Sequence, residues 1–235
     1  MSRAETSDRL ISDQLKASFP SAVIGSTIIV LEQTGSTNDA ILQIVSSESP
    51  PSAKEGFVVF AEYQSAGRGQ RGNHWVSAKG KGLWFSILLR PPIQLRESGR
   101  LAVWAIETIS EVIRTEFGVE SVIKLPNDIQ LCGRKVAGVL VEMRAQENAS
   151  HLAVVGIGIN INQSRDDFPV ELQNSAISLA MALGRKVDRQ KFALAILRNL
   201  DLTYRENFPS GVAAAKPFPV ATTIRGKGLV KFRMA

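Results

Sequence analysis

Short apolar runs alternate along the chain with longer segments in which apolar residues recur every three or four positions. The runs are bounded by glycine, proline or polar residues and are rich in β-branched and aromatic side chains, which predicts strands. These runs cover residues 27–31, 56–61, 83–89, 122–125, 136–142 and 151–162. The periodic segments predict helices directly after Ser36 and over residues 97–117, 175–183 and 188–207. The pattern therefore predicts a mixed α/β architecture.

The two ends of the chain differ from this central part. Residues 1–22 predict a short helix with Leu10, Ile11 and Leu15 on one face, and the stretch is about a third of the length that a helix-turn-helix domain needs. Residues 209–235 are rich in proline, glycine and alanine and then basic, which is too little for a second barrel. We therefore expect a helical lead-in (1–22), one main domain (23–208) and a truncated or degenerate tail (209–235), with no DNA-binding domain before the first strand.

A glycine- and arginine-rich loop at residues 67–75 separates two of the predicted strands. Its glycines allow positive φ angles and bring backbone N–H groups close to a ligand. Arg68 and Arg71 offer forked donors suited to a phosphate or a carboxylate. The loop predicts an anion-binding site, and a solvated hairpin tip whose arginines only confer solubility explains it about equally well.

Two further features flank this loop. Ser36 followed by Asp39 approximates a capping box that opens a helix, and the free N–H groups of that helix would bind a polar ligand if they face a site. The usual role of such a pair is capping alone. Gln64, at the end of a strand, is either an ordinary surface residue or a combined donor and acceptor for a ligand beside the loop.

Polar residues also interrupt the later strands. Asn127 and Asp128 follow Pro126 and make a turn, and their side chains could also orient a magnesium ion or a ribose. Lys135 lies at the start of a strand, where it is either a solvated charge or an inward-pointing cation that neutralises a reacting anion. The glycines at 156 and 158 permit close approach of another backbone or a nucleotide.

Charge and composition narrow the functional classes only in part. The net charge of +6 and the pI near 9.7 suit nucleic acid, a phosphorylated ligand or an acidic partner, but the basic residues are spread along the chain. With a lone Cys132 beside His74 and His151, an intrachain disulfide is excluded and a transition-metal site is not expected. The sequence shows neither a signal peptide nor a membrane-spanning run, so we expect a cytoplasmic protein without membrane contact.

Several short motifs, each weak alone, occur together in one order and spacing. They are Gly-Ser-Thr-Asn at 35–38, Gln64 before Gly-Arg-Gly at 67–69, Trp75, Leu-Arg-Pro at 89–91, Lys-x-Pro-Asn-Asp at 124–128, Gly-Arg-Lys-x-Ala-Gly at 133–138 and Gly-x-Gly-x-Asn at 156–160. In this register, residues 27–205 strongly resemble the catalytic domain of the biotin protein ligase (biotin–[acetyl-CoA-carboxylase] ligase) family. The resemblance implies an α+β fold, with a mixed, largely antiparallel sheet packed against helices as in class II aminoacyl-tRNA synthetases.

The resemblance also implies a two-step reaction. The biotin carboxylate attacks the α-phosphate of ATP to give biotinyl-5′-adenylate, and a lysine of a biotin carboxyl carrier protein then attacks the mixed anhydride. Lys135 and Arg68 would be catalytic residues. Biotin and its adenylate would be bound by Ser36, Thr37, Asn38, Gln64, Arg68, Gly69, Gln70, Lys135 and Gly138. ATP and Mg²⁺ would be bound on the side formed by Arg71, Trp75, Asn127, Asp128 and Asn160.

This sequence departs from the family pattern at two positions in the site. Gln70 replaces the second arginine of the usual Gly-Arg-Gly-Arg loop, so we expect weaker retention of the adenylate. Leu125 replaces a tryptophan, which alters the packing expected against the ligand. We expect the family's C-terminal SH3-like domain to be missing or degraded after residue 209.

Other readings stay open at this point. A lipoate or octanoate ligase or transferase of the same superfamily would keep the fold, although its motifs differ from the Gly-Arg-Gly loop. A catalytically inactive, basic module that binds carrier domains or RNA would also fit the charge. The resemblance implies no DNA partner for a chain of this organisation and leaves a homodimer open.

Overall fold

The computed structural model describes residues 8–18, 22–47, 53–146 and 151–209. One sheet of seven strands forms its centre, in the order β1-β2-β3-β7-β6-β5-β4. The strands are β1 (Ile28–Leu31), β2 (Val58–Ala61), β3 (Gly82–Leu89), β4 (Val122–Lys124), β5 (Asp128–Leu131), β6 (Arg134–Arg144) and β7 (Leu152–Asn160). Only the pair β1–β2 is parallel, and the other neighbours run antiparallel. The mixed, largely antiparallel sheet expected from the sequence is therefore confirmed.

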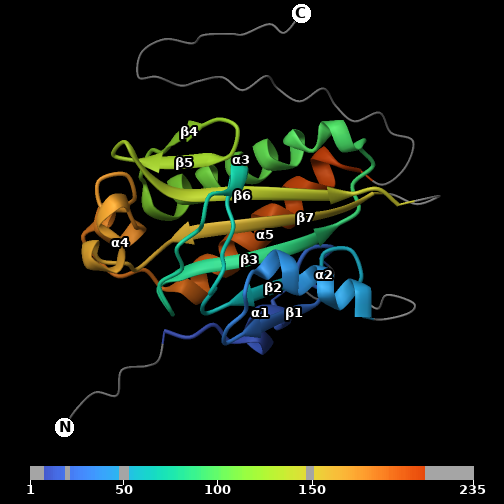
Figure 1. Cartoon of the computed structure of the whole chain (residues 1–235), viewed down its shortest axis with the longest axis horizontal. Helices are drawn as coiled ribbons and strands as arrows, with labels where there is room; N and C mark the ends of the chain where they lie inside the picture. Colours follow the sequence, from blue (N-terminus) through green and yellow to red (C-terminus); the bar gives the residue numbers. More distant parts are fainter. Residues whose placement is uncertain (1–7, 19–21, 48–52, 147–150, 210–235) are drawn as a thin grey trace, which may run out of the picture.

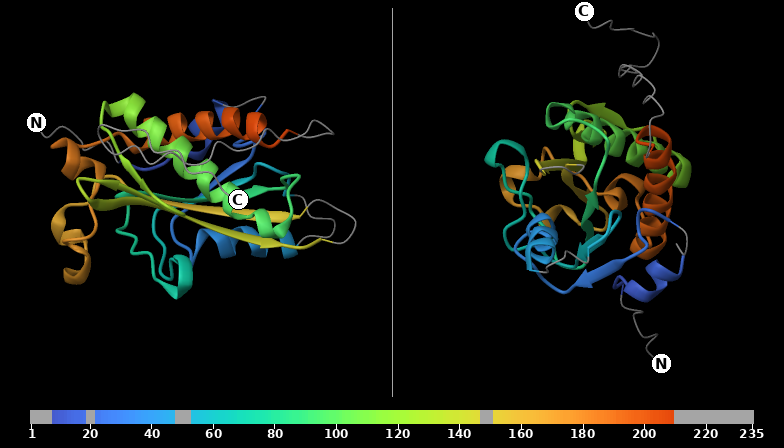
Figure 2. Two further views of the ribbon diagram at one scale, coloured as in Figure 1. Left: turned by 90° about the horizontal axis from the view of Figure 1, so that it is seen from above. Right: turned by 90° about the vertical axis from the view of Figure 1, so that its right-hand side faces the viewer.

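Helices cover the two faces of this sheet unequally. The helices are α1 (Ser12–Ala17), α2 (Thr37–Ser47), α3 (Gly99–Phe117), α4 (Leu179–Leu183) and α5 (Arg189–Asn207), and short 3-10 turns lie at Gln70–Gly72, Leu95–Glu97, Arg165–Asp167 and Val170–Leu172. Figure 1 shows the long helices α3 and α5 behind the sheet, with α2 in front of it. Figure 2 shows the same layers edge-on, with α2 and the β2–β3 loop on the opposite side from α3 and α5. No helix of the described ranges is long and apolar enough to cross a bilayer.

The larger core lies between the sheet and the helices α3 and α5. The predicted apolar stripe of α3 is buried there, and Trp104 donates its indole N–H to Thr203 of α5 over 2.9 Å. Alternate residues of β7 supply the opposite wall, because side chains on a strand point to opposite faces in turn. These residues are Ala153, Val155, Ile157 and Ile159.

The smaller core lies between the sheet and α2, where Ile41 packs against Val59, Leu88 and Val154. Further along the same face, the strands carry small or polar residues in place of large apolar ones. These residues are Ser86 on β3, Gly138 on β6, and Gly156 and Gly158 on β7. The apolar layer therefore ends partway along the sheet and leaves room for a polar site.

Two predicted helices are shorter than the pattern indicated. In the lead-in, α1 covers six residues; Leu10 and Leu15 are buried as expected, but Ile11 is 46% exposed. The helix predicted over 175–183 is reduced to α4, because Ser175 and Ile177 form backbone hydrogen bonds with Lys135 at the start of β6. The expected tail lies outside the described residues apart from position 209.

A buried arginine ties the lead-in to the domain. Arg189, at the start of α5, is fully buried and pairs with Glu62 at 2.8 Å, donates to the carbonyl of Gly82, and contacts Asp8. The same Glu62 accepts the backbone N–H of Leu10 at 2.9 Å. A buried charge is tolerated when it is paired and hydrogen-bonded in this way.

Candidate functional site

A cavity of about 430 Å³ opens on the α2 side of the sheet. It lies between the N-terminus of α2, the loop at 67–75, the β4–β5 turn and the middle of β6 and β7. Nearly all the residues that the sequence singled out line this cavity: Ser36, Thr37, Asn38, Gln64, Arg68, Gly69, Gln70, Arg71, Trp75, Asn127, Asp128, Lys135 and Gly138. Segments more than a hundred residues apart in sequence thus contribute to one site.

One end of the cavity is lined mainly by polar groups that carry no charge, with the carboxylate of Glu142 bonded to Asn38. The hydroxyl of the fully buried Ser86 lies 2.7 Å from that of Thr37 and 2.6 Å from the amide oxygen of Asn38. Thr37 donates its N–H and its hydroxyl to the amide oxygen of Gln64, and Gln64 donates to Ser77. These bonds hold the start of α2 against the end of β2 and orient several neutral donors and acceptors at the cavity wall.

Glycines on the floor of the cavity leave room for the large side chains that lie above them. A Cβ at Gly158 would lie 2.5 Å from the indole ring of Trp75, and one at Gly138 would lie 3.0 Å from that ring and 3.0 Å from Lys135 Cε. Real Cβ atoms do not approach as closely as 2.5 Å, so Gly158 requires the absence of a side chain, whereas a Cβ at Gly138 would force Trp75 or Lys135 to shift by a few tenths of an ångström. Gly156 and Gly158, predicted to allow close approach of a backbone or a nucleotide, instead leave room for the side chains of Asn38 and Trp75.

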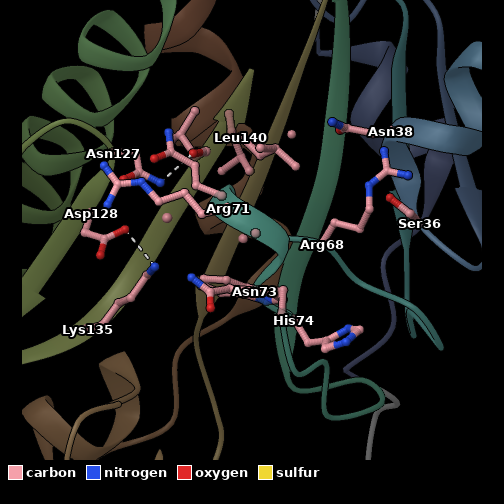
Figure 3. Close-up of a pocket in the computed structure, with 18 of the residues that line it drawn as sticks. Ser36, Asn38, Arg68, Arg71, Asn73, His74, Asn127, Asp128, Lys135 and Leu140 are labelled. Atoms are coloured by element: carbon pink, nitrogen blue, oxygen red, sulfur yellow. Dashed lines mark hydrogen bonds and ion pairs between the residues drawn. The ribbon is translucent and has the colours of Figure 1, made fainter. Parts of the chain in front are cut away.

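The opposite end of the cavity carries several cations. Lys135 Nζ lies 2.7 Å from Asp128 Oδ1 and 5.3 Å from the centre of the Trp75 ring. Arg71, at φ 57° in the left-handed region, extends toward Asn127 and Asp128 (Figure 3). Within the described ranges, neither Arg71 nor Lys124 has a carboxylate partner. This end therefore has positive charge available for an anion.

Arg68 lies at the other side of the cavity from Lys135 (Figure 3). Its guanidinium binds both oxygens of Asp39 at 2.7 and 2.8 Å and Glu142 Oε2 at 2.7 Å. Burial would lower the pKa of Arg68, but the hydrogen bonds and charges of its two carboxylate partners outweigh burial and raise that pKa above its ordinary value. Arg68 and Lys135 thus line one cavity, as expected, but are held by different carboxylates.

Some sequence-based expectations require correction. Asn160 does not line the cavity: it is buried, its amide donates to the carbonyls of Lys135 and Ile177 and its oxygen accepts from Gln163, which gives it a structural role. In the loop, the positive φ angles fall at Arg71 and Gly72.

At Gly67 a glycine is required for a different reason, because there is no space for a side chain. A Cβ at Gly67 would lie 2.5 Å from the carbonyl oxygen of Trp75. The N–H of Gly69 donates to Asn73 within the loop, so this N–H group is not directed at a ligand. The carboxylate of Asp39, expected to close a capping box at the start of α2, binds Arg68 instead.

Sequence reasoning missed Glu142 and Ser86, and it gave Asp39 only a capping role. Both missed residues lie on strands that read as ordinary buried runs, and a polar residue inside such a run is the signal that could have singled them out. Asn73 and His74, at the end of the loop, also line the cavity (Figure 3).

The donor set for a metal ion is small. Among the described residues, no group of three or more His, Cys, Asp or Glu side chains could hold a metal. Magnesium with a nucleotide needs only one or two carboxylates, since phosphates and water supply the other ligands. The carboxylate of Asp128 fits this requirement. The side-chain amide nitrogen of Asn127 donates to the backbone carbonyl of Val139, which leaves the side-chain oxygen Oδ1 as the atom that could bind a ligand.

A mixed sheet covered by two long helices on one face, with a polar, cation-bearing cavity on the other, defines an α+β domain whose cavity has room and charge for an anionic small molecule. The profile of the Biotin/lipoate A/B protein ligase family matches residues 30–160, more than half of the chain. The chain belongs to this family.

Individual relatives agree with this assignment. The chain is 35% identical over 208 residues to the bifunctional ligase/repressor BirA of Bacillus spizizenii, covering 88% of this chain and 63% of that protein. It is 32% identical over 179 residues to the biotin–[acetyl-CoA-carboxylase] ligase of Mycobacterium tuberculosis, covering 73% of this chain and 62% of that protein. The chain thus spans less than two thirds of the length of these relatives.

A solved structure supports the fold as well. The biotin protein ligase from Aquifex aeolicus in complex with biotin and ATP is similar with a TM-score of 0.66 at 28% identity, covering 79% of this chain and 73% of that chain. The fold and the family implied by the sequence motifs are therefore confirmed.

Proposed function

We propose that this chain is an ATP-dependent ligase that activates biotin as biotinyl-5′-adenylate and transfers it to a lysine of a biotin carboxyl carrier protein. The observation that carries the proposal is the division of one cavity into a neutral hydrogen-bonding end and a cationic end. Biotin has a neutral ring system and an anionic carboxylate, and ATP adds further negative charge. A relative named as a biotin–[acetyl-CoA-carboxylase] ligase, and a neighbour solved with biotin and ATP, favour biotin over lipoate.

The neutral end suits the ring system of biotin. Ser36, Thr37, Asn38 and Gln64 place hydroxyl and amide groups along one wall. Such groups orient a ligand with donors and acceptors while the rest of the cavity encloses it. The loop at Gly69 and Gln70, together with Arg68, would close over biotin and exclude water from the mixed anhydride.

The cationic end suits the reacting anions. In the first step a carboxylate oxygen of biotin bonds to the α-phosphorus of ATP and pyrophosphate leaves. The two reactants repel each other, so cations fixed beside them lower the barrier. Lys135 would contact the biotin carboxylate and the phosphoryl oxygens, Gly138 makes space for it, and Arg71 would bind phosphate.

The side of the nucleotide and its metal lies at the β4–β5 turn and Trp75. Asp128, with Asn127, would hold Mg²⁺ against the phosphates, and the metal would offset phosphate charge when bound. Asp128 would then have to exchange its partner Lys135 for the metal, which would leave Lys135 free for the substrate anion. In the second step the acceptor lysine amine bonds to the biotinyl carbonyl carbon, loses a proton, and AMP leaves.

The wider setting is part of the same proposal. Acetyl-CoA carboxylase or a related carboxylase would supply the carrier protein, in the cytoplasm. The basic residues are spread along the sequence rather than clustered, which supports a role without a DNA partner. Self-association as a homodimer is compatible with the sheet, whose edges are formed by β1 and β4.

One incubation tests the proposal. The chain is mixed with ATP, Mg²⁺, labelled biotin and a purified biotin carboxyl carrier domain, and the carrier is analysed by mass spectrometry. We expect one biotinyl group on a carrier lysine, and none when the acceptor lysine is replaced by arginine. Labelling by lipoate or octanoate in place of biotin would support the related ligase. Absence of labelling, with RNA binding that weakens steeply with salt, would support the inactive binding module.

A further inference from the structure

Arg68 joins the glycine- and arginine-rich loop to two other segments of the chain. One guanidinium nitrogen binds both oxygens of Asp39 in the first turn of α2, and the other binds Glu142 Oε2 near the end of β6. These charge-assisted bonds, at 2.7–2.8 Å, are of the short and strong kind. They fix the stem of the loop, where Arg68 also pairs with His74 as an isolated β-bridge.

The same carboxylate is connected to the floor of the cavity. Glu142 Oε2 accepts a hydrogen bond of 2.6 Å from the amide of Asn38, which is 3% exposed. The amide oxygen of Asn38 lies 2.6 Å from the hydroxyl of Ser86. The position of the loop is thus linked through Glu142 to the residues that line the neutral end of the cavity.

Charge also limits what Arg68 can do for a substrate. Its single positive charge faces two carboxylates, so the local sum is negative. Lys135, by comparison, has one carboxylate partner, and Arg71 has none within the described residues. The cations available to an anionic substrate are therefore on the Lys135 side, and the bonds of Arg68 serve to hold the loop.

We propose that Asp39 and Glu142 are positioning residues that hold Arg68, and through it the loop at 67–75, against the mouth of the cavity so that biotin is retained. This inference rests on the proposed function for its substrate. It assigns to Asp39 and Glu142 a role that acts through Arg68 and involves no contact with the reacting atoms. Neutralising both carboxylates should release the loop while leaving Lys135 and its surroundings in place.

The test uses the full chain with Asp39→Asn and Glu142→Gln combined, and each single variant. Trypsin cleaves after arginine, so cleavage after Arg71, identified by mass spectrometry, reports opening of the loop without requiring activity. Because the ion pairs are partly exposed, we expect this cleavage to accelerate about three- to tenfold in the double variant. The KM for biotin in adenylate formation should rise by a similar factor, with kcat changed less than twofold.

Controls separate this role from a general loss of stability. Glu111→Gln removes a carboxylate from an exposed pair with Arg114 in α3 and should change neither readout. Asp39→Glu keeps the negative charge, so its rate of cleavage after Arg71 and its KM for biotin should equal those of the unaltered chain. Thermal unfolding is followed for each variant, and the single variants replace the double variant if it fails to fold.

The outcomes decide the proposal. Unchanged cleavage at Arg71 in the folded double variant would overturn it, as would faster cleavage with an unchanged KM for biotin. If the unaltered chain forms no adenylate, the proposed function fails, and the trypsin measurement still shows whether the carboxylates hold the loop.

Discussion

Gly156 lies directly beneath the side-chain amide of Asn38: a Cβ at position 156 would be 2.3 Å from Asn38 Oδ1. A distance that short is not tolerated, and the neighbouring atoms belong to a side chain that is fixed by Ser86 and Glu142. The missing Cβ on β7 therefore determines where an amide of α2 can sit. This relationship links a glycine in the sheet to the polar wall of the cavity.

The first prediction concerns this glycine. Gly156→Ala should displace Asn38 and weaken biotin binding by about ten- to a hundredfold, equivalent to roughly 1.4–2.8 kcal/mol. Isothermal titration calorimetry with biotin measures the effect. Gly99→Ala is the control, because no atom lies within 4 Å of a Cβ built at Gly99. Equal biotin affinity in Gly156→Ala and the unaltered chain would show that Asn38 does not contribute to the biotin site.

The second prediction concerns the cation beside Asp128. Lys135→Ala should slow adenylate formation by about a hundred- to a thousandfold, as expected when a preorganised group that stabilises transition-state charge is removed. Release of pyrophosphate from ATP in the presence of biotin measures this rate. Lys191→Ala, an exposed residue of α5, should react at the normal rate. A Lys135→Ala variant that adenylates biotin at full speed would remove Lys135 from the mechanism.

The third prediction concerns the departure from the family pattern in the loop. Gln70 lines the cavity, and Gln70→Arg adds a cation where the adenylate carries a negative phosphate. We expect biotinyl-adenylate to dissociate about tenfold more slowly, the effect of one added hydrogen bond to a charged group. Val170→Arg adds the same charge at a residue that is 80% exposed and serves as the control. Unchanged dissociation from Gln70→Arg would count against weaker retention by the natural glutamine.

The fourth prediction concerns the buried arginine at the start of α5. Arg189→Ala leaves the carboxylate of Glu62 buried without its partner, which typically costs about 3–5 kcal/mol. The free energy of unfolding in urea should fall by that amount. Lys191→Ala in the same helix should change it by less than about 0.5 kcal/mol. A small change in Arg189→Ala would contradict this prediction and would mean that water reaches the carboxylate of Glu62 when the guanidinium is removed.

The sequence was sufficient for the large elements and for most of the cavity lining. Six of the seven strands and the helices α3 and α5 follow from hydrophobic periodicity, which reports the face that each element buries. The strand β5 (Asp128–Leu131) lies outside the predicted runs, because its first residue was read as part of a turn. The residues of the motifs come together in space because the antiparallel neighbours β3, β7 and β6 place their central residues side by side. These parts of the fold depend on patterns that are local in the chain.

Partners distant in the chain were not predictable in the same way. Nothing near Arg68 in the sequence indicates that its charge meets Glu142, which is 74 positions further along. The motif around Asn160 predicted that this residue binds a ligand. In the structure its side-chain amide donates to the carbonyl of Ile177, in the segment 175–177 that pairs with Lys135. The shortened helix α4 has the same origin, since pairing with β6 outweighs the local helical pattern.

The alternation of residues along β7 separates the tasks of that strand. Val155 and Ile157 face the larger core under α3 and α5, whereas Gly156 and Gly158 face the cavity. Substitutions intended to broaden substrate specificity should therefore be made at Gly156 and Gly158. Substitutions intended to raise stability should be made at Val155 and Ile157. Because the two sets alternate from Val155 to Gly158, a substitution in that stretch affects stability at the odd positions and substrate selectivity at the even ones.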